Sequence, residues 1–164
     1  MNEGAMQERI VLCRTLDEIQ ALLERFHMAL PSLKRGKEFR AAMAEKFFQH
    51  GKVVFIPEDG RAVGFAAFYC NDHVERKAYL SMIAVYPDMQ GKGCGKELLT
   101  YVEHTAKDCG MRTVWLEVSK ANGSARSFYR KNGYVPVEMR PESMICAKKL
   151  ENASDEWTED THDV

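Results

Sequence analysis

The stretch QGKGCGKELLTYVEHTAKDCG, from Gln90 to Gly110, places three alternating glycines directly before a segment with helical periodicity. Glycine is a poor helix former, so its repeated use at a helix start indicates that something approaches the backbone closely. Backbone N–H groups at a helix N-terminus attract anions, and Lys92 and Lys96 add positive charge. The stretch therefore predicts an anion-binding loop. The alternative is a turn that only connects a strand to a helix.

Two familiar phosphate-binding patterns do not describe this loop. A Walker-type loop, G-x-x-x-x-G-K-[ST], needs a glycine where Gln90 stands and a hydroxyl residue where Glu97 stands. The dinucleotide pattern G-x-G-x-x-G, begun at Gly91, needs a glycine where Lys96 stands, and it opens the first strand–helix turn of its fold. Three further strands are predicted before this loop. The Walker pattern is therefore excluded, and the dinucleotide pattern fits poorly.

Periodicity on both sides of the stretch predicts the order β-α-α-β-β-β-α-β-α-β-β. The expected elements are a strand at 9–13, helices at 15–26 and 37–50, a hairpin turning at Asp59-Gly60, a strand at 77–87, the helix after the glycines, a strand at 111–119, a short helix capped by Asn122, and two last strands. The apolar face expected for the second helix consists of Phe39, Ala42, Met43 and Phe47. The strands that flank the glycine-led helix should be parallel neighbours joined by a right-handed crossover. The fold class is thus α/β, a single-domain mixed, mostly antiparallel sheet of about seven strands flanked by four helices.

Composition limits the possible classes of protein. The 164 residues, 45% of them hydrophobic, suit one domain at 1–150, and the segment 151–164 carries six acids and no Lys or Arg, which predicts a disordered acidic tail. A net charge of −1 gives no reason to expect nucleic acid, and no long apolar run predicts a membrane span or signal peptide. Five scattered cysteines suit reduced thiols in the cytoplasm, and no His/Cys spacing predicts a metal site. A homodimer is left open.

Two motifs together resemble the GNAT acetyltransferase superfamily. The stretch QGKGCG at 90–95 resembles the family's [QR]-x-x-G-x-[GA] pyrophosphate loop. Downstream, WLEVSKANGSARSFYRKNGY resembles its second half-site, with matching residues Asn122, Ala125, Phe128, Tyr129, Gly133 and Tyr134. The resemblance extends over about Arg9 to Leu150 and leaves the acidic tail outside. It implies the acyl-CoA N-acyltransferase fold, with acetyl-CoA as co-substrate.

The resemblance also implies where acetyl-CoA binds. The pantetheine arm would pair with the backbone of the strand before the loop, at Ile83, Ala84 and Val85. The pyrophosphate would rest on the N–H groups of Gln90, Gly91, Lys92, Gly93, Cys94, Gly95 and Lys96, where glycines let the backbone close on the phosphate oxygens. Asn122 would hydrogen-bond the pantetheine arm, cap a helix, or do both. A helix N-terminus tends to lower the pKa of a thiol such as that of Cys94, which we nevertheless interpret as a filler position.

Acetyl transfer to an amine requires a base, an oxyanion donor and an acid, because alkylamines are mostly protonated at neutral pH. The resemblance places Tyr129 as general acid, the alternative being a packing role. Glu117, twelve residues earlier, is the candidate base. The alternatives are that Glu117 faces solvent or pairs with an arginine, or that water relayed through Tyr79 or Ser81 accepts the proton. The oxyanion donor would be the N–H of Val85 or a neighbour.

The resulting hypothesis is an N-acetyltransferase in which a primary amine attacks acetyl-CoA directly in a ternary complex. A catalytically silent acyl-CoA-binding or regulatory module on the same fold is the alternative. The acceptor stays open among a protein N-terminus, a small amine, an amino acid and an amino sugar. The basic run Lys34, Arg35, Lys37 and Arg40 would attract an anionic acceptor or form a solvated turn.

Overall fold

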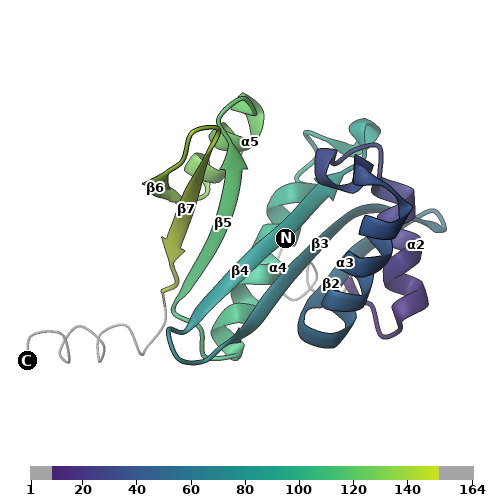
Figure 1. Cartoon of the computed structure of the whole chain (residues 1–164), viewed down its shortest axis with the longest axis horizontal. Coiled ribbons are helices and arrows are strands. Elements are labelled where there is room, and N and C mark those ends of the chain that lie inside the picture. Colours follow the sequence, from purple (N-terminus) through teal and green to yellow (C-terminus); the bar gives the residue numbers. More distant parts are fainter. Residues whose placement is uncertain (1–8, 152–164) are drawn as a thin grey trace, which may run out of the picture. The chain divides into compact units, whose positions relative to one another are not determined.

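The computed structural model describes residues 9–151, and its helices and strands follow the predicted order (Figure 1). The strands are β1 (Val11–Leu12), β2 (Lys52–Glu58), β3 (Arg61–Asp72), β4 (Lys77–Val85), β5 (Thr113–Ser119), β6 (Val135–Met139) and β7 (Ser143–Lys149). The helices are α2 (Leu16–Phe26), α3 (Lys37–His50), α4 (Cys94–Asp108) and α5 (Gly123–Lys131). Two 3₁₀ helices were not predicted, η1 (Pro31–Arg35) and η2 (Pro87–Met89). The predicted acidic tail lies outside the described residues, apart from Glu151.

The seven strands form one sheet in the order β1-β2-β3-β4-β5-β7-β6. The pairs β1–β2, β2–β3, β5–β7 and β6–β7 are antiparallel, whereas β4 and β5 are parallel, with Tyr79 opposite Trp115. This confirms the α/β fold with a mostly antiparallel sheet, and it confirms the parallel pair on either side of α4. Among residues 9–151, no helix is long and apolar enough to span a bilayer.

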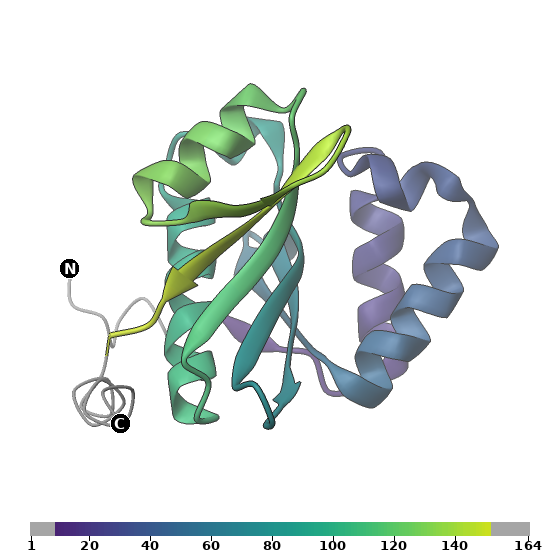
Figure 2. The ribbon, with the colours of Figure 1, turned by 60° about the vertical axis from the view of Figure 1, so that its left-hand side comes forward.

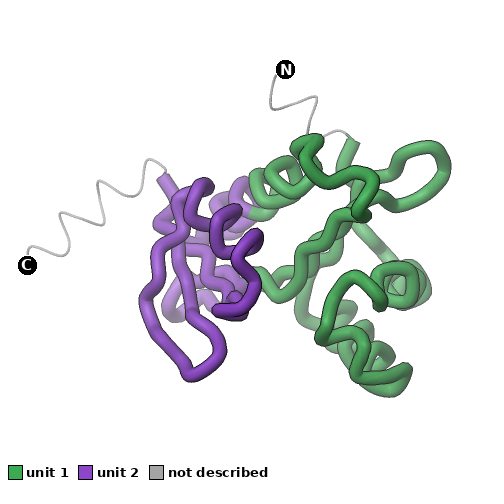
Figure 3. The backbone as a smooth tube through the Cα atoms, turned by 90° about the horizontal axis from the view of Figure 1, so that it is seen from above, with its two compact units in different colours: residues 1–69, 80–102 green, residues 70–79, 103–164 purple. Residues whose placement is uncertain are grey.

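The chain divides into two compact units (Figure 3). Unit 1 consists of residues up to 69 and 80–102, and unit 2 consists of residues 70–79 and 103 onward. In unit 1, α2 and α3 lie on one face of the strands and α4 begins on the other (Figure 2). The core under α2 and α3 is made by Cys13, Ile19, Leu22, Leu23, Phe26, Leu33, Ala44, Phe47, Val53, Phe65, Ala67 and Met82.

Local sequence signals explain several element boundaries in unit 1. Thr15 and Glu18 form the predicted capping box at the start of α2. Asp59 and Gly60 have φ values of 52° and 77°, which confirms the tight turn with two positive-φ residues between β2 and β3. The predicted apolar face of α3 is partly wrong, because Ala44 rather than Ala42 is buried beside Phe47.

In unit 2, a polar contact ties α4 to the strands. The Tyr134 hydroxyl donates to Glu103 at 2.8 Å, and Lys148 of β7 binds the other oxygen of the same carboxylate at 3.0 Å. Tyr134 is 2% exposed, so its hydroxyl needs such a partner. The last part of α4 is therefore held to β7 by charge as well as by apolar packing.

Candidate active site

The loop from Gln90 to Lys96, called the glycine loop below, combines a positive-φ backbone with a helix start. Gly91 and Gly93 have φ values of +81° and +87°, and a Cβ built on either would meet no atom within 4 Å. Helix α4 begins at Cys94, so Gly95 lies in its first turn, unlike the other two glycines. The loop is therefore open on the side where both glycines lack a side chain.

The start of α4 leaves backbone donors available. The N–H of Glu97 donates to the Gly93 carbonyl at 2.9 Å. The N–H groups of the three preceding residues, 94–96, thus come too early for an i−4 acceptor inside the helix. Lys92 and Lys96 are exposed beside them. This arrangement has the donors, the dipole and the charge that an anion such as a pyrophosphate requires.

Two side chains of the glycine loop are used within the protein. The Gln90 amide donates to the Val85 carbonyl at 3.0 Å and so joins the loop to the end of β4. Cys94 is 2% exposed, so only its backbone is available to a ligand. Burial raises the pKa of the Cys94 thiol, although Arg9 opposes this shift. The expectation that the helix terminus would lower that pKa is therefore wrong.

The end of β4, which includes the predicted Ile83, Ala84 and Val85, is held against β3 by close packing. A Cβ built on Gly64 would lie 3.2 Å from the Ala84 carbonyl oxygen and 3.4 Å from a Val85 methyl carbon. The same Cβ would lie 3.2 Å from Cδ1 of Leu98 on α4. Gly64 therefore permits a close approach of strand and helix that a larger residue would disturb.

A partly buried ion pair near the glycine loop was missed by the sequence analysis. Glu97, in the first turn of α4, is 7% exposed and accepts a hydrogen bond from Arg9 Nε at 2.7 Å. Arg9 Nη2 also lies 3.7 Å from the Cys94 sulfur. An acid in a first helical turn is an ordinary sequence feature. Its partner, 88 residues earlier, is supplied only by the fold.

Unit 2 contains the predicted acid, Tyr129. Its side chain comes from α5, is 9% exposed, and makes edge-on ring contacts with Phe128 and Tyr134 at 5.4 and 5.7 Å. Burial raises the pKa of the Tyr129 phenol well above its usual range, and Cys146 and Tyr79 add to the shift. The phenol is therefore a neutral hydrogen-bond donor throughout the physiological pH range.

Asn122 caps α5, which confirms one of its two interpretations. Its Oδ1 accepts hydrogen bonds from the Ala125 N–H at 3.1 Å and the Ser124 hydroxyl at 3.3 Å. The cap explains why the chain turns into a helix directly after β5. Contact with pantetheine stays a prediction.

Glu117, the predicted base, has partners that the sequence could not identify. Its Oε2 accepts from the Ser143 hydroxyl at 2.5 Å and from Arg140 Nη1 at 3.4 Å. The Arg140 Nε also donates to Glu138 at 2.8 Å. The Arg-paired alternative thus describes the geometry, and it does not by itself decide whether Glu117 takes part in proton transfer.

Tyr79 lies on the same face of the sheet as Glu117. Tyr79 is paired with Trp115, and Glu117 is two residues further along β5, so their side chains project to one side. Burial raises the pKa of the Tyr79 phenol, Glu117 raises it further, and Arg140 opposes the shift. Within unit 2, the candidate relay residue Tyr79 therefore interacts electrostatically with both the predicted acid Tyr129 and the candidate base Glu117.

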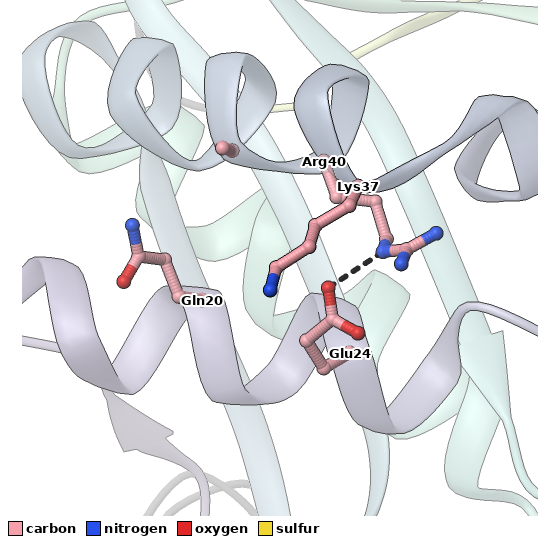
Figure 4. A pocket seen from close by; sticks show the side chains of 5 residues that line it. Gln20, Glu24, Lys37 and Arg40 are labelled. Carbon is pink, nitrogen blue, oxygen red and sulfur yellow. Dashed lines mark hydrogen bonds and ion pairs between the residues drawn. The ribbon is translucent and has the colours of Figure 1, made fainter.

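A hollow of about 330 Å³ lies between α2 and α3 in unit 1. Its lining consists of Gln20, Glu24, Lys37, Arg40 and Ala41. Figure 4 shows Lys37 and Gln20 reaching into the space between the helices and Arg40 paired with Glu24, at 2.6 Å. Arg40 also donates to the Leu33 carbonyl at 2.9 Å, and Arg35 stacks on Phe39 at 4.1 Å. Two cations of the basic run are therefore engaged locally.

Sequence comparison identifies relatives of this chain. The sequence model of the acetyltransferase (GNAT) family matches residues 16–134. A [ribosomal protein bS18]-alanine N-acetyltransferase of Haemophilus influenzae is 40% identical over 83 residues, which are 51% of this chain and 54% of that protein. An uncharacterized ycf52-like N-acetyltransferase of Prochlorococcus marinus is 31% identical over 136 residues, or 82% of this chain and 69% of that protein. The chain thus spans about half the length of the first relative.

Solved structures show the same fold. Ard1 from Thermoplasma volcanium superposes with a TM-score of 0.70 at 18% identity, covering 88% of this chain and 99% of that chain. The PaiA N-acetyltransferase of Thermoplasma acidophilum, solved in complex with coenzyme A, has a TM-score of 0.66 at 21% identity, covering 85% and 98%. From the family match and the shared fold, we conclude that the chain belongs to the acetyltransferase (GNAT) family, whose members use acetyl-CoA.

Proposed function

We propose that this protein transfers the acetyl group of acetyl-CoA to a primary amine. The observation that carries the proposal is the glycine loop, in which two positive-φ glycines face open space at the N-terminus of α4. The residues present suit the pyrophosphate of acetyl-CoA, because backbone N–H groups, the helix dipole and two lysines all favour an anion there. The backbone at 90–96 would bind that group, and the backbone of Ile83, Ala84 and Val85 would pair with the pantetheine arm.

Bound acetyl-CoA would supply an acetyl thioester, and the protein's residues would manage the protons around it. A new bond forms between the amine nitrogen and the acetyl carbon, while the bond from that carbon to sulfur breaks. The amine loses a proton and the departing thiolate gains one. Tyr129 is suited to donate that proton because its phenol stays neutral while buried. The N–H of Val85 or a neighbour would stabilise the oxyanion.

Proton removal from the amine is assigned to Glu117, directly or through water. The carboxylate lies on one face of the sheet together with Tyr79, which offers the relay considered above. Ser81 is the other relay candidate, since it follows Tyr79 by two residues on β4. Proton acceptance by a positioned carboxylate typically accelerates such steps by roughly 10²–10⁴-fold.

The first acceptor to test is the α-amine of a polypeptide. The relatives from Haemophilus influenzae and Escherichia coli are named for the alanine of ribosomal protein bS18, and they share 40% and 36% identity with part of this chain. The local engagement of Arg35 and Arg40 weakens the case for an anionic acceptor. Lys37 interacts electrostatically with Glu24, so within residues 9–151 only Lys34 of the basic run lacks a described partner.

The test is release of free CoA thiol from acetyl-CoA across a panel of acceptors. The panel contains peptides that begin with alanine or other residues, polyamines, amino acids and amino sugars. We expect turnover with at least one member, and mass spectrometry should show a gain of one acetyl group on its amine. Saturable CoA binding by calorimetry without turnover of any acceptor would replace this proposal with a silent acyl-CoA-binding module.

A further inference from the structure

We propose that Ser143 and Arg140 are positioning residues that anchor one carboxylate oxygen of Glu117 and leave the other for the acceptor amine. This inference rests on the proposed function, and it adds two residues that would act through Glu117. Arg140 lies in the turn between β6 and β7, Ser143 is the first residue of β7, and Glu117 lies on β5.

The hydrogen bonds to Glu117 are unevenly divided between its two oxygens. Oε2 accepts from the Ser143 hydroxyl at 2.5 Å and from Arg140 Nη1 at 3.4 Å. Oε1 accepts no hydrogen bond from any residue within 9–151. A hydroxyl donor this close to a carboxylate makes a strong charge-assisted bond, whereas the guanidinium at 3.4 Å acts mainly through its charge. Ser143 is therefore the main anchor and Arg140 the weaker one.

The turn that carries Arg140 and leads into Ser143 is fixed by the backbone. The Arg140 N–H donates to the Ser143 carbonyl at 2.9 Å, which closes the turn. The Lys120 N–H donates to the Glu142 carbonyl at 2.9 Å, and the Lys120 ammonium lies 3.4 Å from the Pro141 carbonyl. The turn is thus joined to the chain directly after β5. Donors on such a turn hold a carboxylate in one orientation better than donors on a free loop.

Anchoring would matter because a proton acceptor works only within hydrogen-bond reach of its donor. With Oε2 held, rotation of the carboxylate is restricted, and Oε1 keeps its lone pairs for an ammonium group or for a water. In the proposed reaction, the proton that the amine loses passes to Oε1 or to a water bound there. Oε2 keeps its hydrogen bonds to Ser143 and Arg140 while the proton is transferred.

Ser143→Ala tests the anchor, with Ser143→Thr as the matched variant that keeps the hydroxyl. We expect Ser143→Ala to lower kcat/KM for the acceptor by about tenfold, the effect of one charge-assisted hydrogen bond. The KM for acetyl-CoA and the Tm should change little. Ser143→Thr should recover most of the lost activity. Arg140→Gln should have a smaller effect, and Glu142→Gln, on the same turn, should have none.

The decisive measurement repeats Ser143→Ala in a Glu117→Gln background. If the hydroxyl acts through the carboxylate, Ser143→Ala causes no further loss there. An equal loss in both backgrounds would show that Ser143 acts by another route, and a fall in Tm with a matching rise in the KM for acetyl-CoA would show a merely structural role. Either result overturns the anchor. Unchanged kcat/KM in Ser143→Ala, with an active wild type, also overturns the anchor and leaves the proposed function standing. An inactive wild type refutes both.

Discussion

The strongest prediction concerns Gly93, whose φ of +87° lies in the left-handed region. A residue with a side chain costs about 1–2 kcal/mol in that region. No steric cost is added, because a Cβ at this position meets no atom within 4 Å. Alanine also lowers the conformational entropy of the unfolded chain, which stabilises the folded state by roughly 0.4–1 kcal/mol. We therefore expect Gly93→Ala to lower the free energy of unfolding by about 1 kcal/mol, or the Tm by about 2–4 °C.

Gly110 provides a matched control at the other end of α4. Its φ is +86°, and the nearest atom to a Cβ there is Arg76 Nη2 at 3.8 Å, an ordinary contact distance. Gly110→Ala should therefore cause about the same loss of stability as Gly93→Ala. The two variants differ only in whether the added carbon enters the space that the proposed pyrophosphate would occupy.

Calorimetric titration with acetyl-CoA separates the two effects. Gly93→Ala should weaken binding by about tenfold or more, roughly 1.4 kcal/mol, and Gly93→Val should abolish measurable binding. Gly110→Ala should bind acetyl-CoA as the wild type does. Wild-type affinity in Gly93→Val, or an equal loss of affinity in Gly110→Ala, would refute the assignment of the glycine loop to the pyrophosphate.

Three further substitutions test other contacts. Tyr129→Phe should lower kcat by roughly 10²-fold or more while acetyl-CoA affinity and Tm stay nearly unchanged, and full turnover would remove this phenol from the mechanism. Tyr134→Phe removes a buried bond to Glu103 and should cost about 1.5–3 kcal/mol in unfolding experiments. Because the folded pKa of Tyr134 is raised above 10.0, wild-type stability should fall as pH rises past that value, and the variant should fall less steeply. Gly64→Ala places a Cβ 3.2 Å from the Ala84 carbonyl oxygen and should cost about 1–3 kcal/mol and weaken acetyl-CoA binding, which melting curves and titration would check.

Local features were predicted well because short-range rules determine them. The bounds of α3, Lys37–His50, matched the expected helix, since Gly36 and Gly51 flank a run of good helix formers. Its buried face was less predictable, because α3 carries few strongly apolar residues and both Ala42 and Ala44 suit a helix. The burial of Ala44 depends on packing in the core that α3 shares with α2 and the strands.

The site was predictable at the level of backbone motifs but not of side-chain partners. The positions of the glycine loop and of the Asn122 cap follow from short sequence patterns. The partners of Glu117 lie 23 and 26 residues away, at Arg140 and Ser143, and depend on how β5, β6 and β7 are aligned. Likewise, the direction of the Cys94 pKa shift depends on burial, which its position at a helix start did not reveal.

The cap at Asn122 determines the kind of group that this residue could recognise. Because Oδ1 is engaged by two donors within α5, only the Nδ2 amide hydrogens face other partners. A ligand held by Asn122 must therefore present an acceptor such as an amide carbonyl, and a ligand offering only donors would find no complement. Aspartate at this position would preserve the helix start and remove the donor, so a ligand-binding role of this side chain would be chemically separable from its role as a helix cap.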